Sequence, residues 1–140
     1  MGALLNHQEH QEHQAISAEA DVVGRAVVDA GVKVHRALGP GLLESAYEHC
    51  LAHELNARGL AVRRQVAPPI LFDGIQIEAG YRLDLLVSDL VIVEVKAVEA
   101  LAPLHEAQLL TYLKLSGLRL GYLVNFNVKL LKQGLRRLAL

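Results

Sequence analysis

Apolar residues recur every three or four positions in the first part of the chain, the spacing of a helix with one buried face. The first run begins near Ala15 and is predicted to end around Leu38, where the Gly-Pro-Gly segment 39–41 stops it. A second run starts near Leu42, and Gly59 is well placed to end it. The pattern therefore predicts two consecutive helices that pack on a sheet.

The period changes after the second helix, because β-branched and alternating apolar residues replace the helical spacing. We expect a first strand over about residues 61–71 and a second over 75–87, joined by an Asp-Gly turn signal. Pro68 and Pro69 interrupt the first strand, which places it at a sheet edge or breaks it with a bulge.

The second half of the chain alternates strand and helix. The run 90–95 is apolar except for Glu94, as expected of a central strand that is covered on both faces. Helical spacing returns over 104–116, followed by a buried strand over 118–126 and a short terminal strand over 134–140. The pattern indicates an α/β fold in which a mixed central sheet is flanked by helices.

Length and composition indicate one domain. The 140 residues are 52% hydrophobic, enough for one buried core, which we place in residues 15–140. Residues 1–14 contain the polar run HQEHQEHQ, with no apolar face to bury, and are expected to form a mobile tail. No apolar stretch is long enough to span a membrane, and no secretion signal is seen, so we expect a cytoplasmic protein without membrane contact.

Charge and hydropathy limit the partners. A formal net charge of −1 argues against a broad basic surface that grips nucleic acid, so contact with DNA or RNA would be local, metal-assisted or weak. The mean hydropathy of +0.27, with only 21% charged residues, suggests that another subunit covers some apolar surface. We therefore predict a homodimer.

The acidic residue of the central strand requires an explanation, because a carboxylate in an apolar strand costs several kcal/mol unless it is paired or binds a cation. Glu94 and Lys96 lie two apart and so share a face of the strand. On the preceding strand, Leu83 and Leu85 flank Asp84 just as valines flank Glu94. A partly buried ion pair with Lys96 is the alternative that involves no chemistry.

Strand register decides whether these side chains meet. Asp84 lies opposite Glu94 only if paired residue numbers sum to 178, which requires an odd connection such as Ser88–Leu90. In that register Asp84, Glu94 and Lys96 converge, with two oxygen ligands suited to Mg²⁺ or Mn²⁺ beside one ammonium. Such a cluster lowers the pKa of a bound water and stabilises charge on a phosphoryl group.

The sequence YRLD at 81–84, followed by EVK at 94–96, resembles the D…(D/E)xK signature of the PD-(D/E)XK nuclease superfamily, and the element order is similar to that family's core. Gly41, Glu44 and Tyr47 in GLLESAY resemble the motif of the GxxExxY protein family, a branch of that superfamily. The similarity continues through HEAQLLTYLKLSGLRLGYLVNFNV and so covers roughly residues 20–140.

The resemblance extends the predicted site beyond the strands. It implies Glu44 as a helix-borne glutamate that joins Asp84 and Glu94 at the metal, and Gln108 with Tyr112 as a pair resembling the QxxxY motif of RecB-type nucleases. The alternatives are a first-turn acid favoured by the helix dipole for Glu44, and a helix-surface pair for the other two.

The leading hypothesis is a metal-dependent nuclease that hydrolyses phosphodiester bonds of DNA or RNA. The alternative is a nuclease-fold protein with little or no turnover, which serves as a binding or assembly module. Other candidates are weaker: Cys50 is expected to be an inert buried thiol, and His49 with His53 to be surface residues, since no further zinc ligands lie nearby.

Overall fold

The computed structural model of the protein describes residues 15–68, 70–78 and 81–140. The predicted tail, residues 1–14, lies outside the described residues, and so does Pro69. None of the described helices is long and apolar enough to cross a membrane.

The two predicted N-terminal helices are present as α2 (Ala18–Leu38) and α3 (Glu44–Ala57). Helix α2 begins at Ser17, whose hydroxyl accepts a hydrogen bond from the Ala20 amide at 3.0 Å, and it ends at the Gly-Pro-Gly segment as predicted. Helix α2 is therefore bounded by local signals that the sequence carries, whereas α3 starts after Leu43 without a side-chain cap.

The turn between α2 and α3 is held by the last residue of the GLLESAY motif. The buried Tyr47 hydroxyl donates to the Gly39 carbonyl at 2.5 Å and accepts from the Leu42 amide at 3.1 Å, while its ring stacks on Phe126. Gly41 adopts a φ of 102°, a conformation that glycine reaches without steric cost. Two of the three motif residues thus have structural roles in this turn.

Five strands form a mixed sheet in the order β1-β4-β5-β6-β7. They are β1 (Val62–Val66), β4 (Leu83–Val87), β5 (Val91–Lys96), β6 (Leu120–Asn125) and β7 (Leu135–Ala139). Strands β5 and β6 are parallel, joined through helix α4 (Pro103–Ser116), and the other neighbours are antiparallel. The central position predicted for the strand that carries Glu94 is confirmed, as is the mixed sheet flanked by helices.

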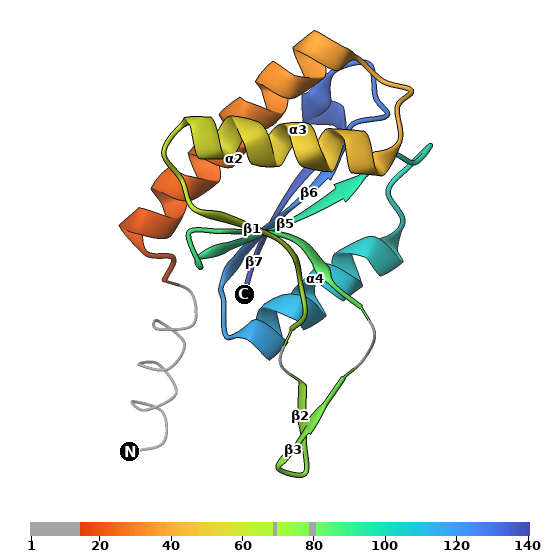
Figure 1. Ribbon diagram of the computed structural model, residues 1–140. Helices are drawn as coiled ribbons and strands as arrows, with labels where there is room; N and C mark the ends of the chain where they lie inside the picture. The colour runs from red at the N-terminus through yellow and green to blue at the C-terminus, as the bar shows by residue number, and fades with distance from the viewer. Residues whose placement is uncertain (1–14, 69, 79–80) are drawn as a thin grey trace.

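The two strands predicted over 61–71 and 75–87 are each divided in the structure. Their inner parts form a separate hairpin, β2 (Ile70–Phe72) with β3 (Ile75–Ile77), which projects from the body of the molecule (Figure 1). Strand β1 lies at the edge of the main sheet, as the position of the two prolines predicted. It ends at Val66, two residues before the first proline.

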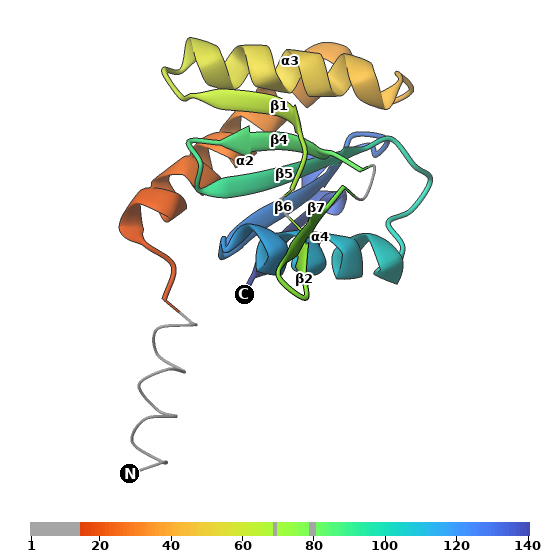
Figure 2. The ribbon, with the colours of Figure 1, turned by 60° about the horizontal axis from the view of Figure 1, so that its bottom comes forward.

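Helices cover both faces of the sheet. Helices α2 and α3 lie on one side and α4 on the other, and the short 3-10 helix η1 (Leu131–Gln133) precedes β7 (Figure 2). The larger apolar cluster joins α2 and α3 to the sheet, and the smaller one joins α4 to the opposite face. Side chains along β5 alternate between these two faces, and Ile92, Glu94 and Lys96 share the face toward α4.

Candidate metal centre

The register of β4 and β5 agrees with the prediction. Leu85 pairs with Val93 and Val87 with Val91, so the paired numbers sum to 178, and the connection is Ser88–Leu90. Asp84 and Glu94 follow directly beyond the last of these pairs. The alternation of side chains excludes a register shifted by one residue, and the observed register brings both carboxylates together.

Strand β4 is irregular at Asp84. Leu83 packs in the cluster under α4, whereas Leu85 packs in the cluster under α2 and α3, so the expected symmetry with the valines around Glu94 does not hold. The Asp84 carboxylate accepts a hydrogen bond from the Val95 backbone amide at 2.8 Å. The backbone amide of Asp84 donates to Glu94 Oε1 at 3.4 Å. Side-chain oxygens therefore take part in the pairing of the two strands at this point.

Glu94 is buried, with 5% of its surface exposed. This burial, together with the nearby negative charge of Asp84 and a hydrogen bond between the two side chains, raises the pKa of Glu94 to about 9 against the weaker opposing effect of Lys96. Two carboxylates so close cannot both ionise in a poorly solvated site unless a cation joins them. At neutral pH the pair without a cation holds a proton.

Lys96 does not form the ion pair that would have explained the buried acid. It is half-buried on the same face of β5 as Glu94, yet across residues 15–68, 70–78 and 81–140 no ion pair joins it to either carboxylate. Its ammonium therefore stands beside the carboxylate pair without neutralising it directly.

A buried glutamate on α3 extends the site. Glu48 accepts hydrogen bonds from Arg64 and, at 2.7 Å, from Gln65 Nε2, which also lies 3.4 Å from Asp84 Oδ1. Burial raises the pKa of Glu48, and the charge of Asp84 adds to this, while the hydrogen bond from Arg64 opposes it. Gln65 thus connects the helix glutamate to the strand aspartate.

Glu48 and Gln65 were not identified from the sequence. Glu48 carried a usable signal, because it continues the helical spacing of the buried Ala52 and Leu55, just as Glu94 interrupts an apolar strand. Gln65 carried none: it reaches the site through a left-handed backbone with φ of 54°, which a strand pattern does not reveal.

The three helix-borne residues predicted from the resemblance lie in different surroundings. Tyr112 of α4 is half-buried, and its pKa is raised by burial first and then by the negative charges of Glu94 and Asp84, so its ring lies near the carboxylates. Glu44, the first residue of α3, and Gln108 of α4 are both exposed. No hydrogen bond or ion pair within the described residues connects either of them to Asp84 or Glu94.

The donor set fits a Mg²⁺-type ion bound by few protein ligands. Within the part of the chain that the structure describes, no three His, Cys, Asp or Glu side chains are arranged around one ion position. Asp84 and Glu94 instead form a two-carboxylate pair with a charge that a cation would neutralise. Mg²⁺ commonly keeps several waters and uses one or two carboxylates together with substrate phosphates.

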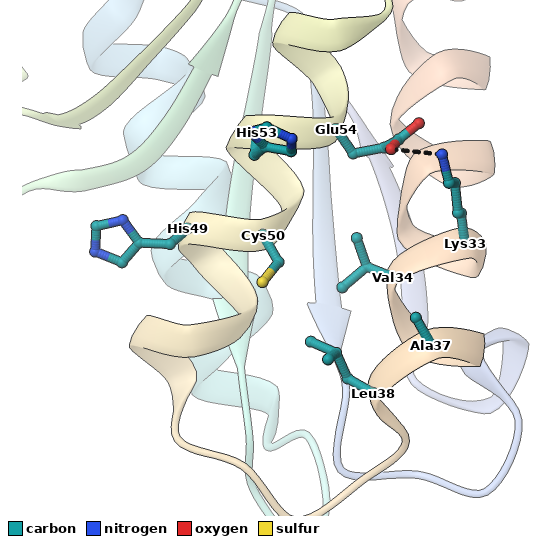
Figure 3. Close-up of a pocket in the computed structure, with 8 residues that line it drawn as sticks. All are labelled: Lys33, Val34, Ala37, Leu38, His49, Cys50, His53 and Glu54. Carbon is teal, nitrogen blue, oxygen red and sulfur yellow. Dashed lines mark ion pairs between the residues drawn. The ribbon is translucent and has the colours of Figure 1, made fainter.

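A separate pocket of about 300 Å³ lies between α2 and α3 (Figure 3). Cys50 lines it and is exposed, so the expectation of a buried thiol is wrong: the stripe that packs on the sheet passes beside Cys50 rather than through it. His49 and His53 are exposed as predicted, and the Lys33–Glu54 ion pair closes one side. Neither Asp84 nor Glu94 nor Lys96 lines this pocket.

Comparison with known proteins agrees with the geometry. The family model of the PD-(D/E)XK nuclease superfamily matches residues 21–138, which include both carboxylates, Lys96 and all but the last residue of the main sheet. No curated protein and no solved structure matches the chain. With its mixed sheet, flanking helices and a family match over most of its length, the chain belongs to the PD-(D/E)XK nuclease superfamily.

Proposed function

We propose that the protein is a nuclease that hydrolyses phosphodiester bonds of DNA or RNA with Mg²⁺ or Mn²⁺. The observation that carries this proposal is the Asp84–Glu94 pair, two carboxylates close enough to share a proton at a buried position between neighbouring strands. Such a pair costs folding free energy, and a bound cation would remove that cost. Membership of a nuclease superfamily supports the same conclusion.

Asp84 and Glu94 are the residues that would hold the ion, with water and a substrate phosphate at its other positions. When bound, the ion supplies a water of lowered pKa and a positive charge beside the phosphoryl oxygens. The hydrogen bond from the Val95 amide fixes the orientation of the Asp84 carboxylate.

Lys96 adds a fixed positive charge on the same face of β5. Because it has no ion-pair partner among the described residues, its ammonium is free to interact with a phosphate oxygen or with the attacking water. Hydrolysis places additional negative charge on the phosphoryl oxygens, and a positive group already in place lowers the barrier.

We propose Glu48, rather than Glu44, as the helix-borne glutamate of this site. Glu48 accepts a hydrogen bond from Gln65, which also contacts Asp84 Oδ1, while the Val95 amide binds Asp84 Oδ2, so each carboxylate oxygen of the aspartate has a donor. Glu44 lies one helical turn earlier and is exposed, and Gln108 is exposed on α4, so any assistance from them would require contact with substrate.

The second candidate is a binding or assembly module with little turnover. One observation favours it: the β2–β3 hairpin carries Phe72 and Ile75 with 67% and 63% of their surfaces exposed, an apolar surface that hydrolysis does not require. A module of this kind would assemble normally when the carboxylate pair is altered, whereas the nuclease would lose hydrolysis.

The deciding experiment combines calorimetric titration of Mn²⁺ with hydrolysis of labelled single-stranded DNA, duplex DNA and RNA. We expect the wild type to bind Mn²⁺ and cleave at least one of these, and Asp84→Asn to lose both. Lys96→Met should retain Mn²⁺ but lose cleavage. Asp89→Asn, at an exposed position in the neighbouring turn, is the matched control and should behave as the wild type.

Folding of each variant is checked by circular dichroism and thermal melting. Cleavage that persists in both Asp84→Asn and Lys96→Met would rule out this site. Mn²⁺ binding without cleavage of any of the three substrates would favour the binding module.

A further inference from the structure

The aromatic residues of this chain are few, and half of them are in the core. Of the four tyrosines and two phenylalanines, three are buried: Tyr47, Tyr122 and Phe126. Phe72 lies on the hairpin. The remaining two, Tyr81 and Tyr112, are partly exposed and stack on each other, with ring centroids 4.7 Å apart and planes inclined by 19°.

This pair lies beside the carboxylates. Tyr81 is three residues before Asp84, in the segment that enters β4, and Tyr112 comes from α4, on the same side of the sheet as Glu94. Tyr112 packs against the apolar cluster beneath α4, whereas Tyr81 lies against Tyr112. The stack therefore begins on the core and ends on a ring that is partly open to solvent.

The hydroxyl groups do not explain this arrangement. The Tyr47 hydroxyl makes two hydrogen bonds, whereas within the described ranges neither Tyr81 nor Tyr112 makes any. Burial raises the pKa of both phenols, so both stay neutral at physiological pH. The contact that joins the pair is therefore the stacking of the two rings, and a neutral π face is the feature that we consider as the contact for a ligand.

A nucleic-acid strand whose phosphate lies at Asp84 and Glu94 carries a base on each neighbouring sugar. Every base has a π face, and stacking on aromatic side chains contributes about 1–3 kcal/mol per base in single-strand binding proteins, largely independent of sequence. A paired base inside a duplex is already stacked on both sides, so only an unpaired base has a free face to offer. The net charge of −1 leaves little phosphate affinity to replace this contribution.

We infer that Tyr81, supported by Tyr112, is a stacking platform for an unpaired nucleobase next to the scissile phosphate, so that the substrate is single-stranded nucleic acid. This inference rests on the proposed nuclease function for the position of the phosphate. It makes Tyr81 a residue that determines specificity, and it assigns no chemical step to the phenol.

The test measures binding rather than hydrolysis, by fluorescence anisotropy of labelled oligonucleotides with Ca²⁺, which also takes oxygen ligands, in place of Mn²⁺. Three probes are compared: a single strand, a strand of the same length with abasic sugars at its central positions, and the duplex. We expect the wild type to bind the single strand more tightly than the other two.

Two variants separate stacking from packing. Tyr81→Phe keeps the ring and should bind as the wild type does. Tyr81→Leu keeps apolar cover over Tyr112 but removes the π face, and it should lose about tenfold in affinity for the single strand and nothing for the abasic strand. Equal thermal melting of the two variants shows that the fold is kept.

Equal losses on normal and abasic strands, no loss in Tyr81→Leu, or wild-type binding of duplex as tight as of single strand would each overturn the inference. These outcomes are distinct from failure of the nuclease proposal. Base-dependent binding with no hydrolysis by the wild type would end that proposal and leave the platform. Hydrolysis without base dependence would end the platform and leave the nuclease.

Discussion

At the scale of single residues, the carboxylate pair holds one proton, which we assign to Glu94. The residue binds that proton more tightly in the folded protein, with a pKa of about 9, than in the unfolded chain, where the value is near 4.5. Between these two values the folded state holds a proton that the unfolded state has released. The metal-free protein should therefore lose stability as the pH rises from about 4.5 to 9.

This prediction is checked by the melting temperature at pH 5 and pH 8 in a chelator. The wild type should melt at a clearly lower temperature at pH 8, corresponding to a few kcal/mol as an order of magnitude, while Glu94→Gln should change much less. Glu99→Gln, at an exposed position close by, should follow the wild type. A Glu94→Gln protein with the full wild-type pH dependence would contradict the assignment of the proton to this pair.

The choice between Glu44 and Glu48 of α3 is also made at the scale of single residues. Glu48→Gln weakens the acceptor that holds Gln65 and Arg64, and we expect Mn²⁺ affinity or cleavage to fall by about tenfold, as for other residues that orient metal ligands. Glu44→Gln should change neither by more than about twofold. Calorimetry and cleavage assays measure both effects, and the reverse order would return the role to Glu44.

At the scale of elements, the turn between α2 and α3 depends on a single hydroxyl. Tyr47→Phe keeps the ring on Phe126 but leaves the Gly39 carbonyl and the Leu42 amide without their partner. We expect the free energy of unfolding to fall by about 1–3 kcal/mol, measured by urea denaturation. Tyr112→Phe, which removes a hydroxyl that has no hydrogen bond within the described residues, should change it by less than about 0.5 kcal/mol.

The β2–β3 hairpin carries none of the proposed site residues, so the site does not account for it. Ile70 pairs with Ile77 and Phe72 with Ile75, so these four apolar side chains share one face. A two-stranded hairpin alone is marginally stable in water, and its charged residues, Asp73 and Glu78, would repel phosphate. The face is therefore better suited to an apolar protein surface than to nucleic acid.

For the whole molecule, the homodimer predicted from the hydropathy stays a prediction, and this face is where we expect the second copy to bind. Phe72→Ser combined with Ile75→Ser should give a monomer by size-exclusion chromatography with light scattering. Leu71→Ser, on the opposite face of the hairpin and just as exposed, should remain a dimer. A wild-type monomer over the accessible concentration range would contradict the prediction.

The main elements and the meeting of Asp84 with Glu94 could be predicted from the sequence alone. The end of α2 followed from the Gly-Pro-Gly segment, and the side-chain period of two gave the condition that paired numbers sum to 178, which the structure meets. The family resemblance added Glu44, Gln108 and Tyr112 as predicted site residues, and it named the superfamily, which the family match confirms.

Other features required the tertiary structure, because they depend on how helices are rotated against the sheet. Glu48 continues the spacing of the buried residues of α3, but only the docked helix shows that this face meets Arg64 and Gln65 of β1. The same rotation leaves Cys50 at a groove rather than in the core. The separate hairpin, the left-handed backbone of Gln65 and the Tyr81–Tyr112 stack arise from segments that meet only after folding. Local pattern therefore determined the helices and most strands of the main sheet, and three-dimensional packing decided the separate hairpin and which side chains surround the carboxylate pair.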